Sequence, residues 1–224
     1  MYTSLFLDLD NTLLDFNKAE TYAISKVLKE NRLPFDEPTV KLYSKINRSF
    51  WESFECGDIP KSAIYTGRFE KLLSVLERNG DPQSLSKQYG EALSYGFFTV
   101  DGAFALLDYL KNKAYVIYAT TNGLSTTQYR RIEGSGLGKY FDKVFVSEDA
   151  GHQKPEKAYF DYVISNIPEN DKSKMLIVGD SQSSDILGGV NAGIDTCWYN
   201  PEGLKAKYPS KYTIASLEEL MSIL

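Results

Sequence analysis

The feature that most constrains the fold is a series of short β-rich segments, each followed closely by polar residues. The first is the apolar run Leu5–Leu7, after which Asp8 and Asp10 come at once. Short runs of this kind, bounded by turn residues, are typical of buried strands, and four more follow in the second half of the chain. We expect these later strands at Tyr115–Ala119, Lys143–Val146, Lys174–Val178 and Thr196–Tyr199.

Helical patterns alternate with these later strands. We expect the helices near Ala103–Leu110, Thr126–Glu133, Glu156–Ile167 and Asp185–Ala192. One helix start, Ser125 to Gln128, has the capping-box pattern, in which the two end side chains satisfy backbone N–H groups of the first turn. Strands that alternate with helices predict an α/β fold with a doubly wound parallel sheet and right-handed crossovers.

A long stretch without any strand pattern separates the first strand from the second. Four helical segments fill it, and Pro- and Gly-containing breakers such as Leu33-Pro34 divide them from one another. We expect these helices at Lys18–Asn31, Glu37–Glu55, Lys61–Asn79 and Gln83–Tyr95. The sequence therefore predicts an α/β core, residues 1–15 and 98–224, and an inserted all-helical cap, residues 16–97.

Composition argues against several classes of partner. The chain has 25 Lys and Arg against 30 Asp and Glu, a formal net charge of −5, so it shows no electrostatic footprint for a nucleic acid polymer or an anionic membrane. No apolar run approaches the roughly 20 residues that span a bilayer. The N-terminal segment lacks a basic stretch, a long apolar run and a cleavage site. We expect a cytoplasmic protein, and nothing in the sequence requires an oligomer.

Polar residues gather where the predicted strands end. The carboxyl ends of parallel strands share one edge of a sheet, and ligands bind in the crevice outside that edge. The residues that we expect to converge there are Asp8, Asp10, Thr121, Asn122, Lys154, Asp180 and Asp185. The set offers carboxylates, a hydroxyl and a cationic group, which are the parts that phosphoryl transfer requires.

Each residue type has a task in such a transfer. A phosphate ester repels an attacking carboxylate unless a cation neutralises its oxygens, and Mg²⁺ binds one or two carboxylates together with phosphate oxygens. Asp8 and Asp180 can supply those carboxylates, while Lys154 and the Thr121 hydroxyl hold the remaining oxygens. Asp10, two residues beyond Asp8, can protonate the leaving oxygen and then take a proton from the attacking water.

The strings that carry these residues resemble the four signature motifs of the haloacid dehalogenase superfamily. They are FLDLDNTLLD, ATTNG, QKPE and GDSQSSD, in that order, and the resemblance covers essentially the whole chain. It implies a Rossmann-like core in which Asp8 is the nucleophile and Asp10 the acid/base. It also implies a Mg²⁺ ion held by Asp8, the backbone carbonyl of Asp10 and Asp180.

The same resemblance implies phosphate binding by Thr121, Asn122 and Lys154, with Asp185 supporting Lys154 or the waters on the metal. Two simpler interpretations stand beside it. Asp185 can be only a residue at a helix N-terminus, and Lys154 can be an ordinary loop lysine before a proline that starts a helix.

Several activities occur within or near this superfamily. Dehalogenases use the nucleophile without a metal and lack the second acid, so Asp10 favours phosphate over halide. Sugar-phosphate phosphatases and mutases share the four motifs and stay open as alternatives. A non-enzymatic phospho-acceptor module is a more remote alternative, because receiver domains carry clustered aspartates, a Thr and a Lys-Pro, but they have no large cap after the first strand.

The cap segments resemble the bacterial branch of pyrimidine 5′-nucleotidases. The strings include Asn47-Arg-Ser-Phe-Trp51 and Thr66-Gly-Arg68-Phe69, together with the core segment GDSQSSDILGGVNAGIDTCWYN. This resemblance implies a small phosphate monoester, a nucleoside monophosphate, as the substrate. Phe16 and Asn17 lie at the expected hinge of the cap, and with Arg68 they are the candidates for substrate specificity. The aromatic residues at helical spacing in the cap are more typical of its core.

Overall fold

The computed structural model describes residues 1–224, and these form two compact units. One unit contains Met1–Asp15 and Phe98–Leu224, and the other contains Phe16–Phe97. None of the helices combines the length and the apolar character that crossing a membrane requires.

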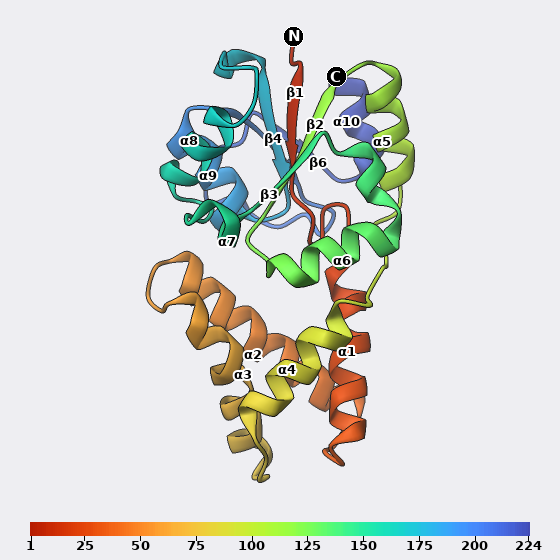
Figure 1. Ribbon diagram of the computed structural model, residues 1–224, viewed down its shortest axis with the longest axis vertical. Coiled ribbons are helices and arrows are strands. Elements are labelled where there is room, and N and C mark those ends of the chain that lie inside the picture. The colour runs from red at the N-terminus through yellow and green to blue at the C-terminus, as the bar shows by residue number, and fades with distance from the viewer. The chain divides into compact units, whose positions relative to one another are not determined.

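The first unit is built on a six-stranded parallel sheet (Figure 1). The strand order is β3-β2-β1-β4-β5-β6, so β1 is central and the chain crosses from one side of it to the other. The bounds are β1 (Ser4–Leu7), β2 (Val116–Thr121), β3 (Lys143–Val146), β4 (Met175–Gly179), β5 (Asp195–Tyr199) and β6 (Tyr212–Ile214). The predicted doubly wound parallel sheet is confirmed. The three-residue strand β6 was not predicted, because so short a segment carries too little alternation to be recognised.

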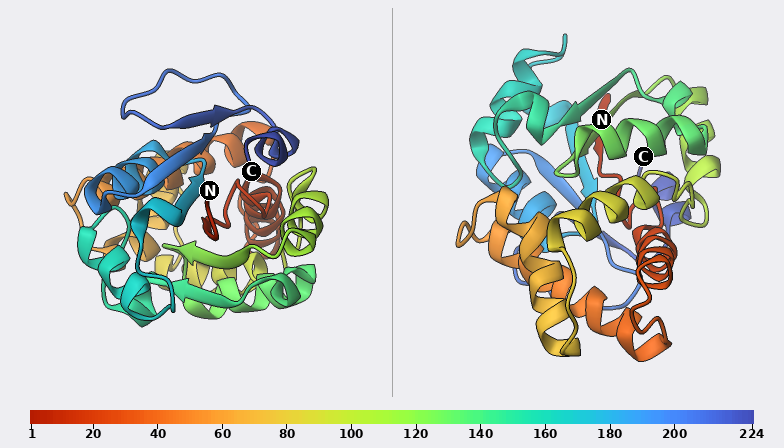
Figure 2. Two further views of the ribbon diagram at one scale, coloured as in Figure 1. Left: turned by 90° about the horizontal axis from the view of Figure 1, so that it is seen from above. Right: turned by 60° about the horizontal axis from the view of Figure 1, so that its bottom comes forward.

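Helices cover both faces of this sheet (Figures 1 and 2). Side chains alternate along β1, so Leu5 and Leu7 belong to the apolar cluster on one face and Phe6 to the cluster on the other. The helices of the first face include α5 (Ala103–Asn112) and α10 (Leu217–Ile223). Those of the opposite face are α8 (Lys157–Ser165) and α9 (Leu187–Ala192). Burial of both faces fixes the register of the central strands, and with it the place where each strand ends.

The shorter elements lie around the loops that connect the strands. After β2 come α6 (Ser125–Ser135) and η1 (Leu137–Tyr140), and after β3 comes α7 (Ser147–Ala150). A turn of 3₁₀ helix, η2 (Lys172–Lys174), leads into β4, and a π-helical turn, η3 (Gln182–Ile186), follows it. The elements that follow the carboxyl ends of β2, β3 and β4 therefore surround the edge where the predicted site residues leave the sheet.

The second unit contains helices only. They are α1 (Phe16–Glu30), α2 (Glu37–Glu55), α3 (Lys61–Leu76) and α4 (Pro82–Leu93), and every end lies within three residues of its expected position. Helix α1 packs against α4 and α2 packs against α3, around a core that includes Tyr43, Phe69 and Tyr89. Asp36 and Asp81 cap the N-termini of α2 and α4, because their carboxylates accept from backbone N–H groups of the first turn.

Candidate active site

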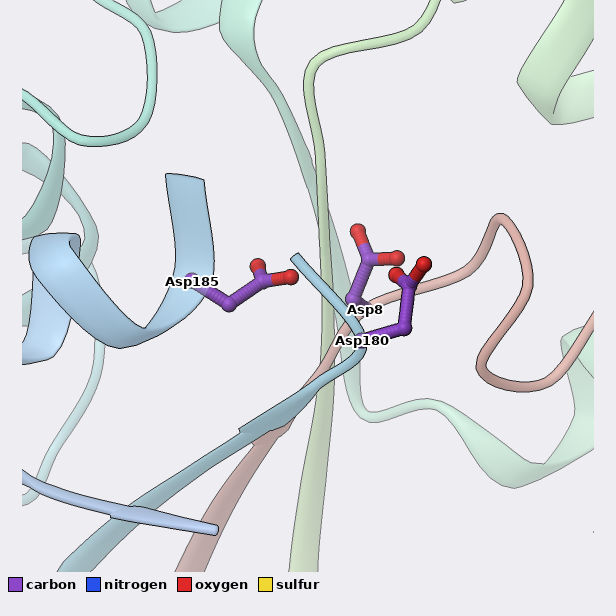
Figure 3. Close-up of side chains that lie close together, drawn as sticks. All are labelled: Asp8, Asp180 and Asp185. Carbon is purple, nitrogen blue, oxygen red and sulfur yellow. The ribbon is translucent and has the colours of Figure 1, made fainter. Parts of the chain in front are cut away.

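Two neighbouring strands bring the acidic residues together. Strands β1 and β4 pair in parallel, and the Asp8 backbone N–H donates to the Val178 carbonyl at 2.9 Å. Asp8 directly follows β1 and Asp180 directly follows β4, so both leave the sheet at the same edge. Carboxylate oxygens of Asp8, Asp180 and Asp185 lie within 4.8 Å of one another (Figure 3).

A buried lysine lies against the same carboxylates. Lys154 Nζ donates to Asp8 Oδ1 at 2.6 Å, to Asp185 Oδ1 at 2.6 Å and to the Thr120 carbonyl at 2.9 Å. All three of its N–H groups therefore have an acceptor. Burial by itself would lower the pKa of Lys154, but the negative charges of Asp185 and Asp8 outweigh that effect and raise it. Lys154 is thus a fixed positive charge between two carboxylates.

The two carboxylates at the strand ends have strongly altered proton affinities. Burial raises the pKa of Asp8 to about 8, although the Lys154 ammonium opposes the change. Burial, followed by the charge of Asp8, raises the pKa of Asp180 well above its ordinary value. Because burial disfavours the ionised forms of Asp8 and Asp180 so strongly, a cation bound beside them would strongly stabilise those ionised forms.

The turn after β4 positions Asp185. In η3 the N–H of Ile186 donates to the Ser181 carbonyl, five residues back, which is the π-helical pattern. Gly179 leaves the space that Asp185 occupies, since a Cβ there would lie 2.2 Å from Asp185 Oδ2. Asp185 Oδ1 accepts from Lys154, and Oδ2 accepts from the Ser181 N–H at 3.2 Å. Both oxygens of Asp185 therefore serve to hold Lys154 and the turn.

Two residues that the sequence did not single out hold Asp180. The backbone N–H of Asp180 donates to Thr12 Oγ1 at 3.1 Å, and its carbonyl accepts from Trp198 Nε1 at 2.8 Å. Thr12 lies within the string FLDLDNTLLD, four residues after Asp8, and this closeness to the expected nucleophile could have identified it as a residue of the site. Trp198 lies on β5, and only the pairing of β5 with β4 brings it to Asp180.

Asn122 fixes the loop that carries Lys154. Its Nδ2 donates to the Lys154 carbonyl at 2.8 Å, and its Oδ1 accepts from the Lys154 N–H at 2.9 Å. Thr121, at the end of β2, is buried, and its Oγ1 accepts from the Gly123 N–H at 3.0 Å. Phosphate binding by Asn122 and Thr121 stays a prediction; in the structure the Asn122 side chain orients the lysine loop.

Asp10 is bound by two side chains of α6. Its Oδ1 accepts from Arg131 Nη1, and its Oδ2 accepts from Gln128 Nε2 at 2.9 Å. The capping-box interpretation of Ser125 to Gln128 was wrong, because α6 begins without a side-chain cap. Gln128 donates instead to Asp10 and to Thr121 Oγ1, so tertiary hydrogen bonds replace the local one.

The donors of this site fit a hard divalent cation. Lys154 supplies one buried ammonium, which pairs with Asp8 and Asp185 and leaves Asp180 beside them without an ion pair to it, whereas Asp10 is paired with Arg131. When all three carboxylates are ionised, one ammonium leaves two formal negative charges in a desolvated place. Oxygen donors of this kind suit Mg²⁺, and one such ion would balance the charge.

The three candidate specificity residues belong to the helical unit. Phe16 and Asn17 open α1. Arg68, on α3, is 5% exposed, and one of its Nη atoms donates to Asn47 Oδ1 at 2.7 Å. Its guanidinium also lies over the ring of Tyr89, 4.5 Å from the centroid, so Arg68 takes part in the interior of this unit. A role for these residues in selecting the substrate stays a prediction.

Known proteins with similar sequences belong to one family. A sequence model of the family described as haloacid dehalogenase-like hydrolase matches residues 5–199. The pyrimidine 5′-nucleotidase PynA of Streptococcus pneumoniae is 37% identical over 225 residues, which are 100% of this chain and 95% of PynA. The pyrimidine 5′-nucleotidase YjjG of Escherichia coli is 34% identical over 226 residues, covering 98% of this chain and 96% of YjjG.

A solved structure extends the similarity to three dimensions. The HAD-hydrolase YfnB of Bacillus subtilis is 40% identical over 226 residues, covering 100% of this chain and 95% of YfnB. The orthorhombic crystal form of YfnB bound to magnesium superposes with a TM-score of 0.95 at 39% identity, over 99% of this chain and 98% of that one. That crystal structure is described as revealing interdomain movement in YfnB.

Proposed function

The chain belongs to the haloacid dehalogenase-like hydrolase family, and from this premise we propose that it is a Mg²⁺-dependent phosphomonoesterase with an aspartyl-phosphate intermediate on Asp8. The observation that carries the proposal is the placement of Asp8. It is buried beside Lys154 and Asp180, and Asp10 follows two residues later. This arrangement supports assigning the nucleophile to Asp8, the fixed cation to Lys154, a metal ligand to Asp180 and the acid/base to Asp10.

In the first step the Asp8 carboxylate attacks phosphorus. An Oδ–P bond forms, and the bond between phosphorus and the ester oxygen breaks. The electron pair of the broken bond goes to the leaving oxygen, which takes a proton from the carboxyl group of Asp10. Lys154 and the Thr121 hydroxyl bind phosphoryl oxygens while charge is redistributed among them.

In the second step water hydrolyses the aspartyl phosphate. The Asp10 carboxylate takes a proton from water, whose oxygen forms a new bond to phosphorus. The Oδ–P bond breaks, and its electron pair returns to Asp8, which becomes a carboxylate again. Inorganic phosphate is released and Asp10 is protonated for the next cycle. Mg²⁺ bound by Asp8, the Asp10 carbonyl and Asp180 would supply the positive charge that offsets repulsion between carboxylate and phosphate.

The substrate class that we propose is the nucleoside monophosphates, with pyrimidine nucleotides preferred. Two relatives that are 37% and 34% identical to this chain over the aligned residues, PynA and YjjG, carry the name pyrimidine 5′-nucleotidase. We assign Phe16, Asn17 and Arg68 to substrate selection within this proposal. A sugar-phosphate phosphatase or mutase is the alternative, and a mutase would return the phosphoryl group to a substrate hydroxyl instead of water.

Release of inorganic phosphate from a panel of monoesters tests this function. The panel should contain pyrimidine and purine nucleoside monophosphates, sugar phosphates and p-nitrophenyl phosphate, each with Mg²⁺ and with EDTA. We expect turnover that needs Mg²⁺ and is fastest with a pyrimidine nucleotide. Turnover that survives EDTA would contradict the proposed requirement for Mg²⁺. Formation of an isomerised sugar phosphate without release of free phosphate would favour the mutase alternative.

The affinity for Mg²⁺ should increase with pH. In the metal-free protein Asp8 has a pKa of about 8, raised from its ordinary 3.8, so a bound cation must displace a proton below that pH. Isothermal titration calorimetry should show the apparent dissociation constant falling by up to about tenfold per pH unit for each displaced proton as the pH rises toward about 8. The same titrations in buffers of different ionisation enthalpy report the proton release directly. An affinity that does not change between about pH 6 and 8 contradicts the proposed role of Asp8.

A further inference from the structure

We propose that Gln128 and Arg131 are positioning residues of this enzyme, which orient the acid/base Asp10 and the phosphate-binding hydroxyl of Thr121. The inference rests on the roles proposed above for Asp10 and Thr121. Gln128 and Arg131 both lie on α6, three residues apart, and so on one face of the helix. Neither lies within the four strings by which the family was recognised in the sequence.

The amide of Gln128 links three functional side chains. Its Nε2 donates to Asp10 Oδ2 at 2.9 Å and to Thr121 Oγ1 at 2.8 Å, and its Oε1 accepts from Arg131 Nη1 at 3.2 Å. A guanidinium only donates and an ionised carboxylate only accepts, so this set of partners permits a single orientation of the amide. Both amide protons and the amide oxygen are thereby engaged in the network.

This network determines what the Thr121 hydroxyl can do. Its Oγ1 accepts from Gln128 Nε2 at 2.8 Å and from the Gly123 N–H at 3.0 Å. A hydroxyl oxygen has two acceptor lone pairs, and both are occupied here. The O–H of Thr121 is therefore left to act as a donor, which is the role that a phosphoryl oxygen requires.

The same network holds both oxygens of Asp10. Oδ1 accepts from Arg131 and Oδ2 accepts from Gln128, so the rotation of the carboxylate is fixed. The Arg131 side chain is 0% exposed, whereas that of Asp10 is 29% exposed. Burying a guanidinium is energetically unfavourable unless it is well paired. The buried Arg131 guanidinium therefore holds the Asp10 carboxylate in one place. Because Asp10 is partly exposed, the lone pairs on its carboxylate that are not used by Arg131 and Gln128 can reach a substrate or a water.

The backbone beside Thr121 is shaped to admit Gln128. A Cβ added at Gly123 would lie 2.7 Å from Cγ and Cδ of Gln128, which is closer than real Cβ atoms come to other carbons. The turn after β2 and the Gln128 side chain are thus packed directly against each other. This contact is independent of the hydrogen bonds and places Gln128 against the phosphate-binding turn.

Two substrates with different leaving groups test the action of Arg131 on Asp10. A nucleoside monophosphate releases an alkoxide, which needs the proton of Asp10, whereas p-nitrophenyl phosphate releases a stable phenolate, which does not. For Arg131→Met we expect kcat/KM to fall by about 10- to 100-fold with the nucleotide and by less than about threefold with p-nitrophenyl phosphate. Arg130→Met, an exposed position on the same helix, is the matched control and should change neither value. Arg131→Lys should recover part of the loss.

A second variant tests the action of Gln128 on Thr121 without changing side-chain size. Gln128→Glu replaces the Nε2 donor by an oxygen, to which the Thr121 hydroxyl would donate instead of to phosphate. We expect inhibition by inorganic phosphate to weaken by about tenfold, which corresponds to one hydrogen bond to a charged group. Thermal denaturation of each variant establishes that it is folded. If Arg131→Met does not fold, the single variants Arg131→Lys and Gln128→Glu test the positioning of Asp10 and Thr121 in its place.

The outcomes separate this inference from the proposed function. Equal losses with both substrates in Arg131→Met, or no loss with either, contradict a positioning role toward Asp10. Unchanged phosphate inhibition in Gln128→Glu contradicts the role toward Thr121. If Asp10→Asn retains full activity with the nucleotide, the proposed mechanism itself fails, and if the wild type releases no phosphate from any monoester, both proposals are overturned together.

Discussion

Replacement of Asp8 by asparagine is expected to abolish turnover and to leave the fold intact. Asparagine has nearly the shape of aspartate, but its neutral amide does not attack phosphorus, so no covalent phosphoryl intermediate can form. We expect kcat with saturating nucleotide and Mg²⁺ to fall by on the order of 10⁴-fold or more. Mass spectrometry of acid-quenched wild-type protein should in turn detect phosphate on the peptide that contains Asp8.

The same variant should be more stable than the wild type in metal-free buffer at high pH. The pKa of Asp8 is raised from 3.8 to about 8, so the folded protein keeps a proton that the unfolded chain releases. Stability therefore falls as the pH rises from about 4 through about 8, and the neutral asparagine removes that loss. Asp161→Asn, at an exposed ion pair with Lys157, is the matched control and should alter neither activity nor stability measurably. An Asp8→Asn variant that still turns over would exclude Asp8 as the nucleophile.

Replacement of Lys154 by methionine is expected to damage activity and stability together. Methionine has similar length and no charge, so Asp8 and Asp185 would lose their buried partner. Removing one partner of a buried ion pair costs about 3–5 kcal/mol, and chemical denaturation should show a loss of that order in the free energy of unfolding. Phosphate release should fall strongly as well, because no fixed cation would bind the phosphoryl oxygens.

The pH dependence of that loss identifies its cause. Lys154 opposes the upward shift in the pKa of Asp8, so its removal raises this pKa further. At low pH Asp8 is protonated and neutral, so the destabilisation should be smaller there than at about pH 8. Adding Asp185→Asn to Lys154→Met should restore part of the stability, since one unpaired carboxylate disappears. Lys157→Met, at an exposed position three residues away, is the control. If the losses of stability in Lys154→Met and Asp185→Asn simply add in the double variant, the buried pairing of the two residues is contradicted.

Much of the core architecture follows from local patterns. Strands β1 to β5 are short apolar runs, and such runs between helices can be recognised without knowledge of their partners. Parallel pairing then requires their carboxyl ends to share an edge, so the proximity of Asp8, Lys154 and Asp180 was predictable in outline. The α6 start shows the limit of this reasoning. Ser125 to Gln128 has a local capping pattern, yet the stronger partners of Gln128 are Asp10 and Thr121.

The sequence by itself determined the order of the first five strands and of the main helices between them, the insertion of a helical segment after the first strand, and the set of polar residues at the strand ends. Only the tertiary structure decided which of those residues pair with one another. Lys154 lies between Asp8 and Asp185, and Arg131 binds Asp10, across separations of 146, 31 and 121 residues. The physical reason is that periodicity reports which face of an element is buried, whereas the partner of a buried charge depends on strand order and on how helices pack against the sheet.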